Sequence, residues 1–270
     1  IISLYASEKY IFAPDYNLTA MKKIKYTLIS LAIAIGLKAC WVKNDSQIAL
    51  KGTFLNESYL AHASDTLLSA IPFYCTELVF DRPDSVLVRN GVEEYPLKYE
   101  IHQDTCFVKN AYQHQGKLRD LVLILSSDTS FVALEQEFTG QSQPASFRKT
   151  SIFKGFEYGL NNATVAGKYT IVDSATQKEV VVTFTADGRI EGLPTYQKFS
   201  VCYSGDCVSE PLEASNVIML ENAQKEVEFA VWRFDKSTKR LTILKLAKPQ
   251  PDIKGERAIQ STLLEAGKIS

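Results

Sequence analysis

Surplus charge of either sign is missing from this sequence. Its 270 residues include 30 Lys and Arg against 31 Asp and Glu, which gives a net charge of -1. Because no basic surplus is present to neutralise phosphates, a nucleic-acid partner is not expected. Low-complexity segments are also missing, so long disordered regions are not expected. What is abundant is Tyr, Phe, Val, Ile and Thr, a composition that favours strands over helices.

Motifs for catalysis or metal binding are missing too. The sequence has no Gly-x-Ser-x-Gly turn, no glycine-rich phosphate loop and no Cys-x-x-Cys. Its three histidines, His62, His102 and His114, do not have the spacing of metal ligands. His102 and Cys106, placed on one extended strand, would lie about 13 Å apart, too far for proton transfer. The sequence therefore predicts a non-enzymatic protein without a cofactor, and hydrolase activity is a minor alternative.

The segment 21–40 is typical of an export signal. Three lysines in 22–25 precede an apolar run over 26–37. This run is shorter than the roughly 20 residues that span a bilayer, so it is interpreted as the core of a signal peptide. The run leads into Leu-Lys-Ala-Cys at 37–40, which resembles the bacterial lipobox. The resemblance implies cleavage before Cys40 and acylation of Cys40; a plain secretory signal with a chance cysteine is the alternative.

An anchor at Cys40 predicts how the flanking residues are used. Residues 1–20 are interpreted as an over-extended start, 21–39 as the signal peptide and 40–48 as a lipidated tether. Trp41 follows the cysteine in place of the Asp that retains many lipoproteins at the inner membrane. By that analogy the expected location is the cell envelope, on the outer membrane facing the periplasm, with the membrane itself as one partner.

The remaining chain predicts a mainly β fold with two tandem lobes. Short alternations of apolar and polar residues, cut by turn-forming residues, indicate antiparallel barrel-like or sandwich-like lobes. The expected boundaries are lobe 1 at 49–135, a linker at 136–164, lobe 2 at 165–248 and a loose tail at 249–270. One short helix is expected in the first lobe, over about 58–71, from apolar residues at a 3.6-residue period.

The two lobes share a diffuse internal repeat, which suggests a duplication. Four segments of the first lobe have loosely similar counterparts about 100 to 115 positions later, always in the same order. The pairs are 50–54 with 165–169, 78–80 with 182–184, 99–101 with 199–201, and 123–125 with 231–234.

One hairpin of the second lobe resembles a known family. The sequence from Phe184 to Gly192 contains Asp187-Gly188, and Asp-Gly supplies the positive φ of a tight turn while Phe184 packs inward. This pattern resembles META-type (HslJ-like) envelope domains. Gly-Lys-Tyr at 167–169 is similar to the start of those domains and of lipocalin-like barrels. The Gly-Cys-Asn that usually follows in META domains is replaced here by Leu-Pro-Thr at 193–195. The resemblance implies a β-barrel-like fold and no catalytic residue.

The cysteines beyond Cys40 are an even set, which fits an oxidising compartment. Cys202 and Cys207 flank a four-residue turn and are candidates for a hairpin disulfide. Cys75 and Cys106 then form the second candidate pair. Half of a zinc site is the alternative for Cys202 and Cys207, although no His or second cysteine pair lies nearby in sequence.

The functional expectation is an envelope lipoprotein with a structural or interaction role, partnered by another envelope protein. The alternative is a lipocalin-like carrier, because the many aromatic residues of both lobes could line a cavity for an apolar ligand. Such residues more often fill the core, which favours the interaction role.

Overall fold

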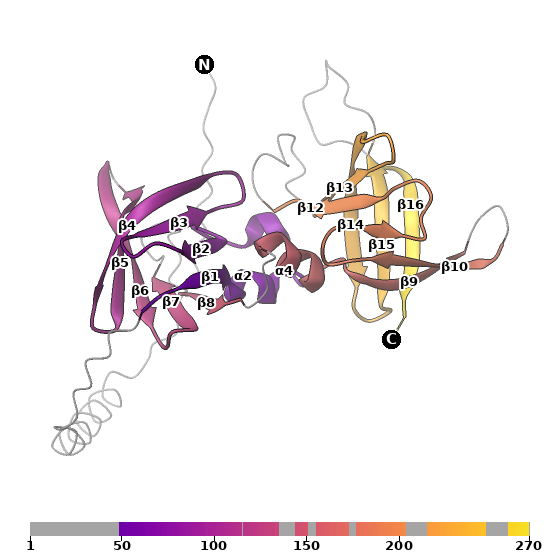
Figure 1. Cartoon of the computed structure of the whole chain (residues 1–270). Coiled ribbons are helices and arrows are strands. Elements are labelled where there is room, and N and C mark those ends of the chain that lie inside the picture. The colour runs from indigo at the N-terminus through magenta and orange to yellow at the C-terminus, as the bar shows by residue number, and fades with distance from the viewer. Residues whose placement is uncertain are drawn as a thin grey trace, which may run out of the picture. The chain divides into compact units, whose positions relative to one another are not determined.

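The computed structural model describes residues 49–114, 116–134, 144–150, 155–172, 177–203, 215–246 and 259–269. The prediction of a mainly β fold is confirmed: two sets of eight strands follow one another along the chain (Figure 1). Among these residues, no helix is both long enough and apolar enough to cross a bilayer. The expected export signal and Cys40 lie outside the described residues.

The first eight strands form a closed barrel. Each strand pairs antiparallel with the next in the chain, and β8 pairs with β1 to close the ring. The strands are β1 (Gly52–Asn56), β2 (Glu77–Phe80), β3 (Ser85–Arg89), β4 (Glu94–His102), β5 (Thr105–His114), β6 (Lys117–Leu125), β7 (Ser130–Leu134) and β8 (Ala145–Lys149). Closure pairs the edges that an open sheet would leave exposed.

Side chains fill the interior of this barrel. Buried and partly exposed residues alternate along strands such as β3 and β7, so one face of these strands contributes to the core. Phe131 stacks on Phe147 with ring centroids 5.2 Å apart and meets Phe54 at 4.9 Å. Phe80 packs edge-on against Phe54 at 5.7 Å. These aromatic residues form a packed core.

The second set of strands forms an eight-stranded antiparallel sheet in the order β11-β10-β9-β16-β15-β14-β13-β12. Its strands are β9 (Gly167–Val172), β10 (Glu179–Phe184), β11 (Ile190–Glu191), β12 (Lys198–Val201), β13 (Val217–Glu221), β14 (Val227–Asp235), β15 (Arg240–Leu246) and β16 (Ile259–Lys268). Arg189, directly before the edge strand β11, forms an isolated bridge with Lys198 of the other edge strand, β12. Phe199 N–H also donates to the Gly188 carbonyl at 2.8 Å. The sheet therefore curls until its two edges touch.

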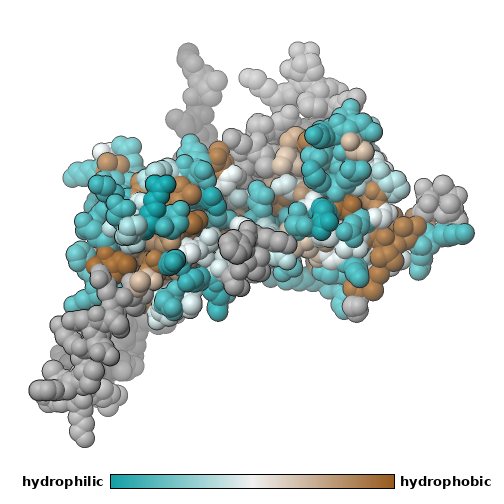
Figure 2. All heavy atoms as spheres, viewed as in Figure 1, coloured by the Kyte–Doolittle hydropathy of each residue, from teal (hydrophilic) through white to brown (hydrophobic). Residues whose placement is uncertain are grey.

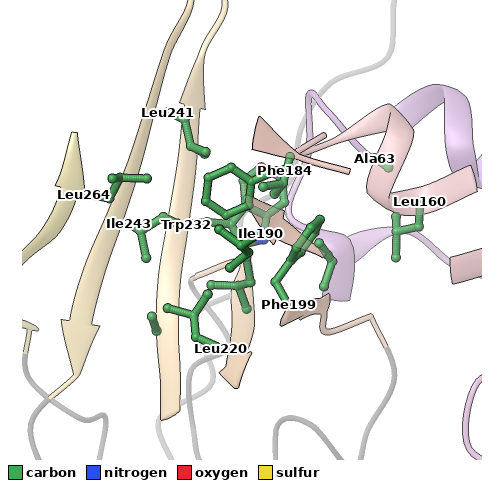
Figure 3. Close-up of a cluster of buried hydrophobic side chains, with 14 of the residues drawn as sticks. Ala63, Leu160, Phe184, Ile190, Phe199, Leu220, Trp232, Leu241, Ile243 and Leu264 are labelled. Carbon is green, nitrogen blue, oxygen red and sulfur yellow. The ribbon is translucent and has the colours of Figure 1, made fainter. Parts of the chain in front are cut away.

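Two short helices and a 3-10 turn complete the core of this sheet. They are α2 (Glu57–His62), η1 (Leu68–Ala70) and α4 (Phe156–Ala163). Apolar residues from these elements join the strand residues in one cluster, where Trp232 lies among Phe184, Ile190 and Phe199, and Leu160 comes from α4 (Figure 3). The first lobe thus supplies α2 and η1 to the core of the second.

The predicted helix over 58–71 is shorter in the structure. Asn56 caps α2, since its side chain accepts a hydrogen bond from Tyr59 N–H at 2.9 Å. The helix ends at His62, and η1 follows after a turn. The apolar period extends past the helix because Leu68 and Ile71 are buried in the same cluster as Tyr59. The apolar period over 58–71 therefore indicated one buried face and not one continuous helix.

Three elements lie where none was expected. β8 and α4 fall inside the expected linker 136–164, and β16 falls inside the expected loose tail. β16 occupies the interior of the second sheet, between β9 and β15, where Leu264 and Ala266 face the core. Its sequence, with only Ile259 and Thr262 as β-branched residues, has no alternation to mark a strand. Pairing on both sides overrides this local preference.

Candidate functional site

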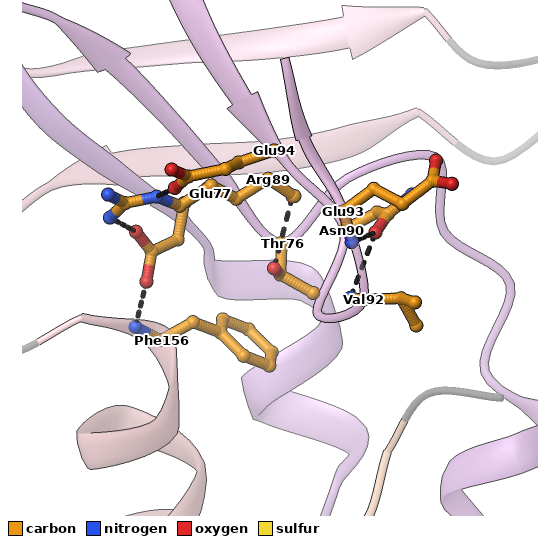
Figure 4. Close-up of polar contacts among 8 residues, drawn as sticks. All are labelled: Thr76, Glu77, Arg89, Asn90, Val92, Glu93, Glu94 and Phe156. Atoms are coloured by element: carbon orange, nitrogen blue, oxygen red, sulfur yellow. Dashed lines mark hydrogen bonds and ion pairs between the residues drawn. The ribbon is translucent and has the colours of Figure 1, made fainter. Parts of the chain in front are cut away.

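A buried carboxylate connects the first barrel to α4 (Figure 4). Glu77, at the start of β2, exposes only 7% of its side chain. One carboxylate oxygen accepts a hydrogen bond from Phe156 N–H, and the other lies 3.0 Å from Arg89 Nη1. Phe156 opens α4, where backbone N–H groups lack helical partners and the helix dipole favours negative charge. A Cβ on the preceding Gly155 would meet the same carboxylate oxygen, so glycine permits this close approach.

The outer side of this contact is an open cleft of about 410 Å³. Arg89 donates from Nε to Glu94 at 3.0 Å as well as contacting Glu77. Hydrogen bonding to Glu77 raises the pKa of Arg89, so the guanidinium stays charged. Carboxylates outnumber cations among the residues that line the cleft, which are Thr76, Glu77, Arg89, Gly91, Val92, Glu93, Glu94, Gly155, Phe156, Glu157 and Tyr203. The contact between Glu77 and α4 is therefore structural, and the cleft beside it has an acidic lining.

Replacing Glu77 with Gln tests the structural role of its contacts with Arg89 and Phe156. The amide oxygen can still accept from Phe156 N–H, but the charge next to Arg89 and the helix terminus is lost. We expect the free energy of unfolding, measured by urea denaturation, to fall by about 1–3 kcal/mol. Glu94→Gln removes the other carboxylate that Arg89 contacts. Because the Glu94 side chain is 62% exposed, this change should lower the free energy of unfolding by less than about 1 kcal/mol. Equal losses in the two variants would contradict a special role for Glu77.

A second depression opens at the other end of β2. The barrel-mouth groove, about 430 Å³ in volume, is lined by Ala49, Leu50, Lys51, Phe80, Asp81, Arg82, Pro83, Tyr99 and Ile101. Leu50 and Phe80 are buried and form its apolar floor. Tyr99 packs edge-on against Phe80 with centroids 5.2 Å apart and forms a wall. Lys51 and Arg82 are exposed at its rim. A polar rim over an apolar floor is the usual construction of a small-molecule site.

The described cysteines are all buried. Burial raises the pKa of the Cys106 thiol to about 12, so this thiol stays protonated and unreactive near neutral pH. Cys106 is free, and the expected bond to Cys75 is not formed.

The other predicted cysteine pair stays a prediction. Cys202 directly follows β12 and is buried on the outer face of the second sheet, where Val217 and Val231 contact it. Cys207, the other half of the expected Cys202–Cys207 disulfide, lies outside the described residues. The lipidation candidate Cys40 lies outside the described residues as well.

The histidines are spread over separate elements. His62 ends α2, His102 ends β4 and His114 ends β5. His102 pairs with Thr105 across the tight β4–β5 turn and is 68% exposed, whereas Cys106 points into the core. The two lie on neighbouring strands with opposite orientation, and not on one face of one strand as expected. Within the described ranges, no three His, Cys, Asp or Glu side chains are grouped to hold a metal ion.

Comparisons with protein-family models, with curated proteins and with solved structures returned no match. The Asp-Gly turn itself has the predicted conformation: Gly188 has φ of 83° and Phe184 is 1% exposed. These features agree with the local argument from turn geometry. The likeness to META-type and lipocalin-like domains remains a resemblance of sequence.

Proposed function

We propose that this chain is a cell-envelope lipoprotein, held at the outer membrane by lipids on Cys40, whose folded part binds another molecule at its surface. The lysines of 22–25, the short apolar run and the Leu-Lys-Ala-Cys ending support the anchor. The first strand begins at Gly52, so only a short tether separates the fold from Cys40. Several acyl chains on one cysteine would make the attachment durable, because one chain alone binds only marginally.

The observation that carries the surface role is the filled interior of the first barrel. Its core residues are each exposed by 8% or less and pack together as one cluster. Binding is then expected at clefts and at projecting elements. Figure 2 shows an apolar patch over the hairpin of β9 and β10, where Val172 is 60% and Val181 is 53% exposed. Exposed apolar patches of this kind are typical of contact surfaces.

A carrier of an apolar small molecule is the second candidate, and the barrel-mouth groove favours it. Its volume of about 430 Å³ lies within the range of small-molecule sites. The groove is at the rim, so it differs from the central cavity that a lipocalin-like carrier uses. The two roles are compatible because they use different parts of the surface.

Cys40→Ser is the experiment that tests the anchor. Without the acylated thiol, the tether gives no hydrophobic attachment, and we expect the protein to move from the membrane fraction to the soluble fraction after cell lysis. The readout is immunoblotting of both fractions. Trp41→Asp is the matched control: it keeps the thiol, so the protein should stay on membranes. Membrane association that is unchanged in Cys40→Ser would refute the anchor.

The surface role is tested on the same samples. Crosslinking of intact cells should join wild-type protein to a defined envelope protein, and the adduct should weaken in Cys40→Ser because the local concentration of the partner falls. Mass spectrometry of the extracted protein identifies the adduct. Protein that never yields a crosslinked partner, while carrying a stoichiometric lipophilic molecule, would favour the carrier.

A further inference from the structure

The barrel-mouth groove combines two features that a plain surface depression does not need. Its floor consists of buried apolar side chains, Leu50 and Phe80, with Tyr99 and Ile101 half-buried beside them. Its rim holds Lys51 and Arg82, and no ion pair or hydrogen bond occupies either cationic group in the part of the chain that the structure describes. By contrast, Lys109 at the neighbouring β4–β5 hairpin is fully engaged by Glu100 and Asp120.

The rim has a defined charge balance. Lys51 and Arg82 contribute two positive charges, and Asp81 contributes the one carboxylate among the lining residues. The sum is one positive charge, which complements a ligand that carries a single negative charge. Arginine and lysine groups that lie free at a rim can each form charge-assisted hydrogen bonds with a carboxylate.

The floor determines the rest of the ligand. Aliphatic and aromatic side chains offer no hydrogen bonds, so the part of the ligand that covers Leu50, Phe80 and Ile101 has to be apolar. The volume of about 430 Å³ is near the lower end for small-molecule sites and suits one aliphatic chain. We propose that the barrel-mouth groove binds a long-chain fatty acid, with its carboxylate at Lys51 and Arg82 and its chain along the apolar floor.

The position of the groove in the chain fits a ligand that comes from a membrane. Ala49 lines the groove and is nine residues after Cys40. Nine extended residues span at most about 30 Å, so an anchored chain keeps the groove close to the bilayer surface. This step rests on the proposed lipid anchor, whereas the chemistry of the groove does not.

Photocrosslinking tests the site directly. Full-length protein in vesicles of zwitterionic phospholipid is exposed to palmitate that carries a photoreactive group in its chain, and labelled peptides are located by mass spectrometry. We expect label within 49–51, 80–83 or 99–101, the segments that line the groove. The double variant Lys51→Gln with Arg82→Gln should lower this label about 10-fold or more, since each charge-assisted contact contributes 1 kcal/mol or more.

Two controls make the result specific. Lys117→Gln with Arg119→Gln removes the same charge from β6, at exposed positions outside the groove, and should leave the label unchanged. A photoreactive hexadecanol, which lacks the carboxylate, should label the groove weakly and should not respond to the Lys51 and Arg82 changes. Label that lies elsewhere, that survives the double variant or that is equal for the alcohol overturns the proposal. Because the probe is added directly, the site and the anchor can fail independently of each other.

Discussion

Gly192→Ala is expected to lower the free energy of unfolding by about 2–5 kcal/mol, through backbone strain and overpacking together. Gly192 directly follows β11 and has φ of 82°. Glycine adopts this conformation readily, whereas L-residues rarely do. A Cβ at this position would collide with the carbonyl oxygen of Val181 and lie 3.3 Å from its carbonyl carbon. Both atoms belong to the backbone of β10, so no side-chain rotation relieves the contact.

The collision would also weaken the contact that closes the second sheet. β11 pairs with β10 at only two positions, and the bridge to β12 is formed by Arg189, directly before β11. Moving β11 away from Val181 would therefore separate the two edges of the sheet. We expect faster amide hydrogen exchange in β11 and β12 of the variant, measured together with urea denaturation.

Gly116→Ala is the matched control for this prediction. Gly116 has φ of 75°, close to that of Gly192, but nothing lies within 4 Å of the position that its Cβ would take. Only the backbone strain of about 1–2 kcal/mol is then expected. If the two alanine variants lost the same free energy of unfolding, the collision with Val181 would contribute nothing to the loss in Gly192→Ala.

The sequence predicted the class of fold but not every strand. Alternation of apolar and polar residues predicted strands in both lobes, because aromatic and β-branched residues pack well on a pleated, half-buried surface. β8 was not predicted: it has five residues, and only Ala145 and Phe147 are buried in its first positions. The strand exists because it pairs with both β7 and β1, a non-local condition that no local pattern contains.

The internal repeat is the part of the prediction that the topology supports most directly. The four matched pairs of segments fall on β1 and β9, β2 and β10, β4 and β12, and β6 and β14. Each pair therefore holds the same ordinal place within its set of eight strands. Both sets also pair their strands in chain order, apart from the narrow contact between β11 and β12. Duplication of one eight-stranded unit is the simplest interpretation of this shared order.

The candidate sites were not predictable in the same way. Glu77 and Phe156 are 79 residues apart, and nothing local indicates that a carboxylate at the start of β2 would cap α4. The barrel-mouth groove brings together Lys51, Arg82 and Tyr99 from three segments, and only the closed register places them at one rim. Of these residues, Lys51 and Tyr99 lie in segments that the sequence marked, as parts of the repeat at 50–54 and 99–101, and that pattern does not indicate a groove.

A second large effect is expected at Trp232, in the core of the second sheet. Trp232 is 2% exposed, and its indole Nε1 is the buried side-chain polar atom without a hydrogen-bond partner in the described structure. Figure 3 shows the indole among apolar side chains, including Phe184, Ile190 and Phe199. Truncation in Trp232→Ala removes most of this packing and should lower the free energy of unfolding by about 3–5 kcal/mol.

Trp232→Phe separates the packing of the ring from its unpaired N–H. Phenylalanine keeps an aromatic ring but removes a donor whose burial without a partner costs about 1–3 kcal/mol. This gain offsets much of the packing energy that the smaller ring loses. The free energy of unfolding of the variant should therefore lie within about 1 kcal/mol of the wild-type value. Circular dichroism during urea denaturation measures both variants without relying on tryptophan fluorescence. A loss in Trp232→Phe as large as that in Trp232→Ala would mean that the indole N–H is paired after all, for instance by a buried water molecule.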